Sequence, residues 1–166
     1  IINLESAALH PLQSATDMMT IQEHQKSDHP KVVLSWAPHI KPLPHAVANS
    51  FLQWADAMDM NISITHPKGM DLSPEFTKGK KAIYDQEEAL EGADFVYVKN
   101  WSSYQDYGQV KSHPKWMITL DKLKNTHDAK LMHCLPVRRN LVIADDALDS
   151  QHSIVQQQAA NRLFTA

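Results

Sequence analysis

Short runs of β-branched and aromatic residues alternate with segments of helical periodicity in this sequence, and this alternation constrains the fold more than any other feature. The strand-like runs are 31–36, 62–66, 95–99, 130–133 and 153–155. The predicted helices are 11–24, 46–58, 120–124, 145–148 and one from 157, with shorter helices starting near 73 and 85. Such alternation builds βαβ units, which predicts an α/β fold: a parallel sheet of about five strands with helices on both faces.

The first predicted helix begins at Pro11, which suits a first helical turn because the N–H that proline lacks would have no helical partner there. Leu12, Ala15 and Met19 recur at helical spacing, so we expect them to form its buried face. Residues 1–5 have the composition of a strand, and a chain that starts inside a strand indicates a piece of a longer protein. A processed mature terminus is the alternative.

The composition limits the classes of protein to consider. With 166 residues, 43% of them hydrophobic and 21% charged, the chain suits one globular domain. The formal net charge of -3 without basic runs argues against a nucleic-acid partner, and no apolar stretch is long enough to span a membrane. The single cysteine, Cys134, predicts no intrachain disulfide and a cytoplasmic location. Ten scattered histidines lack ligand spacing and four distant glycines exclude a dinucleotide loop, so no metal or cofactor is expected.

Ligands of parallel sheets bind beyond the carboxyl ends of the strands, so three segments should carry the function. These segments are 37–44, 100–108 and 134–140. Lys99 ends the third predicted strand and can neutralise a substrate carboxylate; the alternative is an ordinary exposed lysine. The proline-rich first segment holds polar groups such as His39 in a stiff loop, or else it is a structural turn that packs Trp36.

Two adjacent arginines, Arg138 and Arg139, follow the fourth predicted strand. Two guanidinium groups this close repel each other unless anions hold them. Recognition of a carboxylate or phosphate is one interpretation, because arginine offers planar, bidentate donors. A solvated turn that pairs them with Asp145 or Asp146 is the other.

Cys134 stands in the same loop and has the chemistry of a nucleophile. A buried, inert thiol is the commoner situation for a lone cysteine. His133 and Cys134 are adjacent on extended chain and should point to opposite faces, so we do not predict a catalytic dyad from these two.

Two motifs, His10-Pro11-Leu12-Gln13 and His133-Cys134-Leu135-Pro136, resemble motifs of the aspartate/ornithine carbamoyltransferase family. His133-Cys134-Leu135-Pro136 resembles the family's carbamoyl-phosphate loop, and His10-Pro11-Leu12-Gln13 resembles its His-Pro-x-Gln motif. The strings HCLPVRRN, WAPH, PLPHAVANS and KNW are similar to the branch that acts on N-acetylornithine or N-succinylornithine. The likeness runs from about residue 3 to residue 162, and it implies the Rossmann-like second domain of a carbamoyltransferase.

The resemblance implies roles on the carbamoyl-phosphate side. The catalytic residues would be His10, Cys134 and Leu135. His10 would donate a hydrogen bond to the carbamoyl carbonyl oxygen, and Gln13 would bind the carbamoyl amide. Backbone groups around Cys134 and Leu135 would bind the carbamoyl amino group, and Arg162 would line the carbamoyl-phosphate side.

The resemblance also places residues beside the acylated amino acid. Glu5, His39, Lys99 and Arg138 match the positions of the acylornithine branch that face this substrate. The family's ornithine enzymes meet the free α-ammonium with an acidic residue and a Ser-Met-Gly loop. Lys99 would repel that ammonium but suits a substrate whose amine is acylated and whose carboxylate is free.

The implied organisation is the C-terminal, amino-acid-binding half, spanning 1–166, of an enzyme of arginine biosynthesis. Residues 1–24 would lead in from an N-terminal carbamoyl-phosphate domain that this chain lacks. The family's Ser-x-Arg-Thr phosphate motif is absent, so the isolated chain should be inactive, and the family suggests a homo-oligomer, a trimer with shared sites. The alternatives are an ordinary ornithine or other carbamoyltransferase, and a non-catalytic amino-acid-binding domain.

Overall fold

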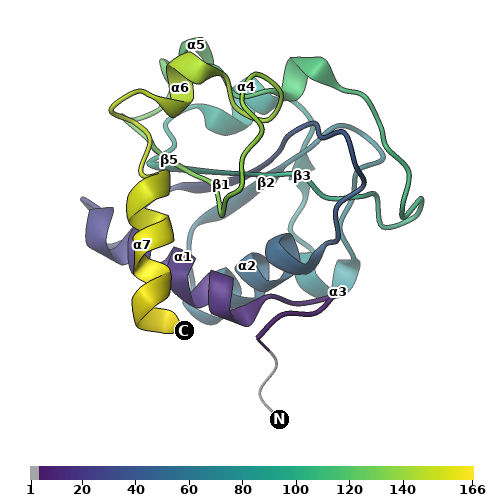
Figure 1. The fold of residues 1–166 in the computed structure, drawn as a ribbon, viewed down its shortest axis with the longest axis horizontal. Coiled ribbons are helices and arrows are strands. Elements are labelled where there is room, and N and C mark those ends of the chain that lie inside the picture. The colour runs from purple at the N-terminus through teal and green to yellow at the C-terminus, as the bar shows by residue number, and fades with distance from the viewer. Residues whose placement is uncertain (1–3) are drawn as a thin grey trace.

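Five parallel strands form the central sheet of the computed structural model, within the described residues 4–166 (Figure 1). They are β1 (Val32–Trp36), β2 (Ile62–Thr65), β3 (Ala82–Ile83), β4 (Phe95–Lys99) and β5 (Lys130–Met132). The strand order is β3-β2-β1-β4-β5, so the first strand lies in the middle of the sheet. Every residue of β1 is buried, as expected for a strand covered on both faces. The predicted parallel α/β sheet is confirmed.

Helices cover both faces of this sheet (Figure 1). One face carries α1 (Pro11–His24), α2 (Ala46–Ala57) and α7 (Val155–Thr165), and the other carries α4 (Gln86–Leu90), α5 (Leu120–Leu123) and α6 (Asp145–Leu148). A short helix α3 (Pro74–Thr77) packs against α2, and a 3-10 turn spans Pro114–Trp116. Side chains of β1 alternate between the two cores: Leu34 packs with the α1 and α2 side, and Val33 with the α4 to α6 side.

The last of the five predicted strands, 153–155, does not form a strand. The segment 153–155 makes a single parallel bridge, Leu131 to Ser153, and α7 then begins at Val155. The Leu131 N–H donates to the His152 carbonyl at 2.7 Å, and the Ile154 N–H donates to the Leu131 carbonyl at 3.0 Å. The chain therefore touches β5 at one residue and turns into a helix. The remaining strand is β3, whose two residues pair with β2 at the sheet edge.

The buried face of α1 also differs from the prediction. Leu12, Ala15 and Met19 are only partly buried, whereas the fully buried positions include Gln13 and Asp17. The helix turns this largely polar face toward α7 and the sheet, where those groups find hydrogen-bond partners. Partnering of buried polar groups, rather than hydrophobic spacing alone, sets the orientation of this helix.

The expected strand over residues 1–5 falls mostly outside the described residues, and Leu4 and Glu5 are not in a strand. None of the helices within 4–166 combines the length and hydrophobicity that crossing a membrane requires.

Candidate functional site

A cavity of about 210 Å³ lies at the edge where the parallel strands end. Its lining residues are Glu5, His10, Gln13, Leu43, Pro44, Ala46, Val47, Lys99, Cys134, Leu135 and Arg162. Seven of the predicted site residues are among them: Glu5, His10, Gln13, Lys99, Cys134, Leu135 and Arg162. Two others, His39 and Arg138, do not line this cavity.

The topology explains why residues so distant in sequence meet here. Lys99 is the last residue of β4, and Cys134 and Leu135 follow β5 within three residues. The loop after β1 contributes Leu43 and Pro44. All these strands are parallel, so their carboxyl ends open on one edge of the sheet. The starts of α1 and α2 and residue Arg162 of α7 complete the wall.

His10 immediately precedes α1 and is almost fully buried. Its backbone N–H donates to Ser50 Oγ at 2.7 Å, which ties the start of α1 to α2. Burial lowers the pKa of the imidazole, Glu5 opposes this shift from 3.7 Å, and the charges of Arg162 and Lys99 add to it. The lowered pKa favours a neutral imidazole, and the buried Nδ1 has no hydrogen-bond partner within the described residues. A neutral ring at a cavity wall can present one N–H donor to a ligand.

Cys134 is partly buried, and its thiol is not set up for nucleophilic attack. Burial raises the pKa of the thiol, which favours the protonated, unreactive form, although the charge of Lys99 acts in the opposite direction. The preceding His133 is turned into the protein, and burial lowers its pKa to about 3. His133 Nδ1 accepts the Leu135 N–H at 2.9 Å, so this ring holds the loop backbone. Leu135 itself has a φ of 52°, in the left-handed region.

Behind the cavity wall lies a buried polar network centred on Asp17. Asp17 Oδ1 accepts a hydrogen bond from Gln13 Nε2 and another from Gln158 Nε2, each at 2.7 Å. Gln158 Oε1 accepts the His133 N–H at 2.8 Å. Burial raises the pKa of Asp17 to about 7, against the opposing effect of the amide donors and the nearby Tyr97 hydroxyl. Neither Tyr97 Oη nor Asp17 Oδ2 makes a hydrogen bond of ordinary length inside the described part of the chain.

The two adjacent arginines have separate environments. Arg139 is held by two carboxylates: its Nη1 donates to Asp145 at 2.7 Å, and its Nη2 donates to Asp149 at 2.6 Å. The pairing predicted as one alternative therefore exists for Arg139. Arg138 is exposed, and no ion pair of its side chain occurs among residues 4–166. Its charge contributes to lowering the pKa of His39, after the larger effect of burial, so these two groups lie near each other outside the cavity.

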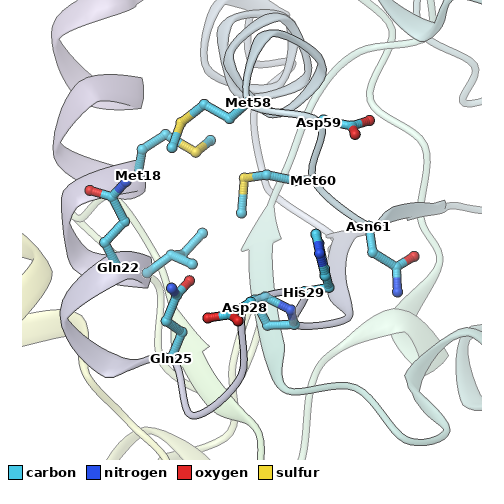
Figure 2. A pocket seen from close by; sticks show the side chains of 11 residues that line it. Met18, Gln22, Gln25, Asp28, His29, Met58, Asp59, Met60 and Asn61 are labelled. Carbon is cyan, nitrogen blue, oxygen red and sulfur yellow. The ribbon is translucent and has the colours of Figure 1, made fainter.

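A second hollow lies at the opposite, amino-terminal edge of the sheet and contains none of the predicted site residues. Figure 2 shows Met18 of α1 together with Met58 and Met60, which follow α2, around this hollow. Asp28 and Asn61 lie in the segments that lead into β1 and β2. The cationic groups and the carboxyl ends of the strands gather instead at the first cavity, which is therefore the candidate functional site.

Sequence reasoning missed some of the site. The apolar part of the cavity wall is formed by Leu43, Pro44, Ala46 and Val47, which lie in the PLPHAVANS string but were given no role there. The Asp17 network was also missed. Its one signal is a Gln and an Asp four residues apart inside a helix, which places both on one face.

The second domain of a known enzyme family matches most of the chain. Residues 44–166 match the model described as the Asp/Orn binding domain of aspartate/ornithine carbamoyltransferase. The chain belongs to the aspartate/ornithine carbamoyltransferase family. This finding fits the predicted motifs and the position of the cavity at the carboxyl edge of the sheet.

Several of the similar proteins act on acylated ornithines by name. The chain is 48% identical to N-succinylornithine carbamoyltransferase of Bacteroides thetaiotaomicron over its whole length, which is 53% of that protein. It is 31% identical to N-acetylornithine carbamoyltransferase of Xanthomonas axonopodis pv. citri, over 98% of this chain and 54% of that one. A crystal structure of an N-acetyl-L-ornithine transcarbamylase variant, complexed with carbamyl phosphate and N-succinyl-L-norvaline, has a TM-score of 0.90 and 30% identity over 99% of this chain and 56% of that chain. The chain thus spans about half the length of these relatives.

Proposed function

We propose that this chain is the amino-acid-binding half of an enzyme that transfers the carbamoyl group of carbamoyl phosphate to the δ-amine of an N-acylated ornithine. The observation that carries the proposal is the single cavity that gathers seven of the residues expected from the family's motifs. The proposed product enters arginine biosynthesis. By the same family likeness, residues 1–24 lead in from a carbamoyl-phosphate domain, and the whole protein is a homotrimer.

The reaction needs orientation and charge stabilisation rather than covalent catalysis. The neutral δ-nitrogen attacks the carbamoyl carbon, and the bond from that carbon to the phosphate oxygen breaks. Phosphate leaves with the bonding electrons and takes up the one proton that the amine loses. His10 donates to the carbonyl oxygen as negative charge develops on it. Arg162 offers a cation to the phosphate side of the cavity. The thiol of Cys134 takes no part in bond making, since its pKa is raised.

Substrate choice is proposed to depend on the cations at the strand ends. Lys99 lines the cavity, and Arg138 is exposed in the loop after β5. Together they favour an α-carboxylate and oppose a free α-ammonium. The 48% identity to an N-succinylornithine enzyme, against 31% to an N-acetylornithine enzyme, supports N-succinylornithine as the substrate.

The deciding experiment compares three acceptors with the full-length protein. We expect kcat/KM for carbamoyl transfer to be highest with N-succinylornithine, lower with N-acetylornithine and lowest with ornithine. The isolated 166-residue chain should show no transfer. Preference of the full-length protein for free ornithine would assign it instead to the ordinary ornithine enzymes. Turnover by the isolated chain at the rate of the full-length protein would refute the division into two halves.

The neighbouring arginines provide a matched pair of variants. Arg138→Met should raise KM for the acylornithine by up to about fivefold, because a charge pair made by an exposed side chain is worth about 0.2–1 kcal/mol. Arg139→Met removes the same charge one residue away, yet its pairing with Asp145 and Asp149 gives it a structural role. It should lower the melting temperature and leave KM nearly unchanged. Equal KM values for the two variants would refute the proposed role of Arg138.

A further inference from the structure

The hydrogen-bond pattern of the Asp17 network runs from a backbone amide to the cavity wall. Its members are Gln13 and Asp17 on α1, Gln158 on α7 and the His133 N–H just after β5. The three side chains are between 0% and 1% exposed, so water does not compete for their hydrogen bonds. Each hydrogen bond in this network therefore determines whether the next group must act as a donor or as an acceptor.

The direction of every bond follows from the first one. A backbone N–H can only donate, so Gln158 must turn its Oε1 toward His133. Its amide nitrogen is then left for Asp17, and Asp17 Oδ1 must act as an acceptor. Gln13 shares the same carboxylate oxygen and must also present its Nε2. A flipped Gln13 amide would place two acceptor oxygens against each other.

The group that remains is Gln13 Oε1, the carbonyl oxygen of a side chain that lines the cavity. It is buried and has no hydrogen-bond partner within residues 4–166. An unpaired buried acceptor is costly unless a ligand supplies a donor. A ligand with an N–H at this position would complete the set, whereas a methyl group or an oxygen would leave Gln13 unpaired.

We infer that Asp17 and Gln158 are positioning residues, which fix the carbonyl of Gln13 toward the cavity and so make the site selective for an –NH₂ group on the ligand. The inference rests on the proposed function, in which that group is the amino group of carbamoyl phosphate. Asp17 acts here as an acceptor shared by two amides. Its second oxygen, Oδ2, takes no part in either bond.

Acetyl phosphate gives a direct test, because it replaces the –NH₂ of carbamoyl phosphate with a methyl group of similar size. Binding of both ligands to the full-length protein would be measured by calorimetry. Asp17→Leu should weaken the binding of carbamoyl phosphate by roughly tenfold or more and leave the binding of acetyl phosphate unchanged, since only carbamoyl phosphate uses the Gln13 acceptor. Asp17→Asn keeps an acceptor oxygen and should restore carbamoyl phosphate to within about threefold of the parent value.

A matched control breaks a polar contact between the same two helices without touching Gln13. Asn161 Nδ2 donates to Thr20 Oγ1 at 3.0 Å and to Glu23 Oε2 at 2.6 Å. Asn161→Leu should affect stability and neither ligand. If Asp17→Leu does not fold, Asp17→Ala replaces it, because alanine leaves a cavity and adds no bulk. The binding of carbamoyl phosphate and acetyl phosphate is then compared in the same way.

Three outcomes overturn the inference. Equal weakening of carbamoyl phosphate and acetyl phosphate by Asp17→Leu would mean a general loss of structure. Unchanged binding of both ligands by Asp17→Leu would mean that Gln13 is oriented without Asp17. If Asp17→Asn binds carbamoyl phosphate as weakly as Asp17→Leu does, the charge of Asp17 matters and not its acceptor oxygen. In these cases the proposed function stands. Failure of the parent protein to bind carbamoyl phosphate at all would remove the proposed function and the inference together.

Discussion

Asp17→Asn should stabilise the fold at high pH and have no effect on it at low pH. Burial raises the pKa of Asp17 to about 7 from a reference value of 3.8. The folded state therefore keeps a proton on this group that the unfolded chain has already lost between pH 4 and pH 7. Stability must then fall as pH rises through this window. Asparagine carries no charge at any of these pH values, and it retains the oxygen that both amides need.

The magnitude follows from the size of the shift. A difference of about three pH units, at about 1.36 kcal/mol per unit, amounts to about 4 kcal/mol. The groups facing the carboxyl are Gln13, Gln158, Tyr97 and Arg162, and all of them lower its pKa, so burial outweighs their sum. We expect the variant and the parent to be equally stable near pH 3.5. The variant should be more stable by about 4 kcal/mol near pH 8.

The assay is urea unfolding of the chain between pH 3.5 and pH 8.5, followed by the fluorescence of the buried Trp36 and Trp101. The histidines titrate in both proteins, so their contribution cancels in the difference between the two. Asp149→Asn is a control with the opposite sign, because Arg139 lowers the pKa of that carboxyl. Asp149→Asn should lower the free energy of unfolding at neutral pH and leave it unchanged in strong acid. A difference between Asp17→Asn and the parent that does not vary with pH would refute the raised pKa.

Three further predictions concern single side chains. Cys134→Ser should leave most of the carbamoyl-transfer activity of the full-length protein, since the protonated thiol is not the nucleophile; a fall to the uncatalysed rate with carbamoyl phosphate still bound would contradict this. His10→Ala should lower kcat by roughly 10²–10³, the usual effect of losing one donor to a developing oxyanion, and an unchanged kcat would reduce His10 to a packing role. Trp36→Phe should lower the free energy of unfolding by about 1–3 kcal/mol, measured by urea titration, because Trp36 Nε1 donates to the buried Trp101 carbonyl at 2.8 Å and its loss leaves that acceptor unpaired.

The sequence predicts most of the fold because β-branched and apolar residues recur at strand or helix spacing between turn-forming residues. The strands β1, β2, β4 and β5 lie within the predicted ranges, and α1 has the predicted bounds. The two-residue β3 is too short to show any periodicity. The segment 153–155 has the composition of a strand, but its neighbours in space allow one bridge to β5 before α7 begins. Pairing of this kind depends on tertiary contacts that local propensity does not describe.

The position of a candidate site residue was predictable where it lies at the end of a strand. Lys99 and Cys134 reach the cavity because parallel strands end at a common edge. The partners of Asp17 were not predictable, because Gln158 lies 141 residues away in the sequence. The different environments of Arg138 and Arg139 were not predictable either, because only the folded structure decides which guanidinium group reaches Asp145 and Asp149.

Two of the helices that border the cavity, α1 and α7, each place one polar residue at the cavity and another, four positions away, in the buried network. On α1, Gln13 lines the cavity and Asp17, four residues later, lies behind it. On α7 the order is reversed, with Gln158 in the buried network and Arg162 at the cavity. Residues four apart share one face of a helix, so each helix supplies one group to the ligand and one to its support. Gln13 and Arg162 therefore each share a helix face with a member of the network, and α7 must be packed against α1, as it is in Figure 1, for the Gln158–Asp17 bond to exist.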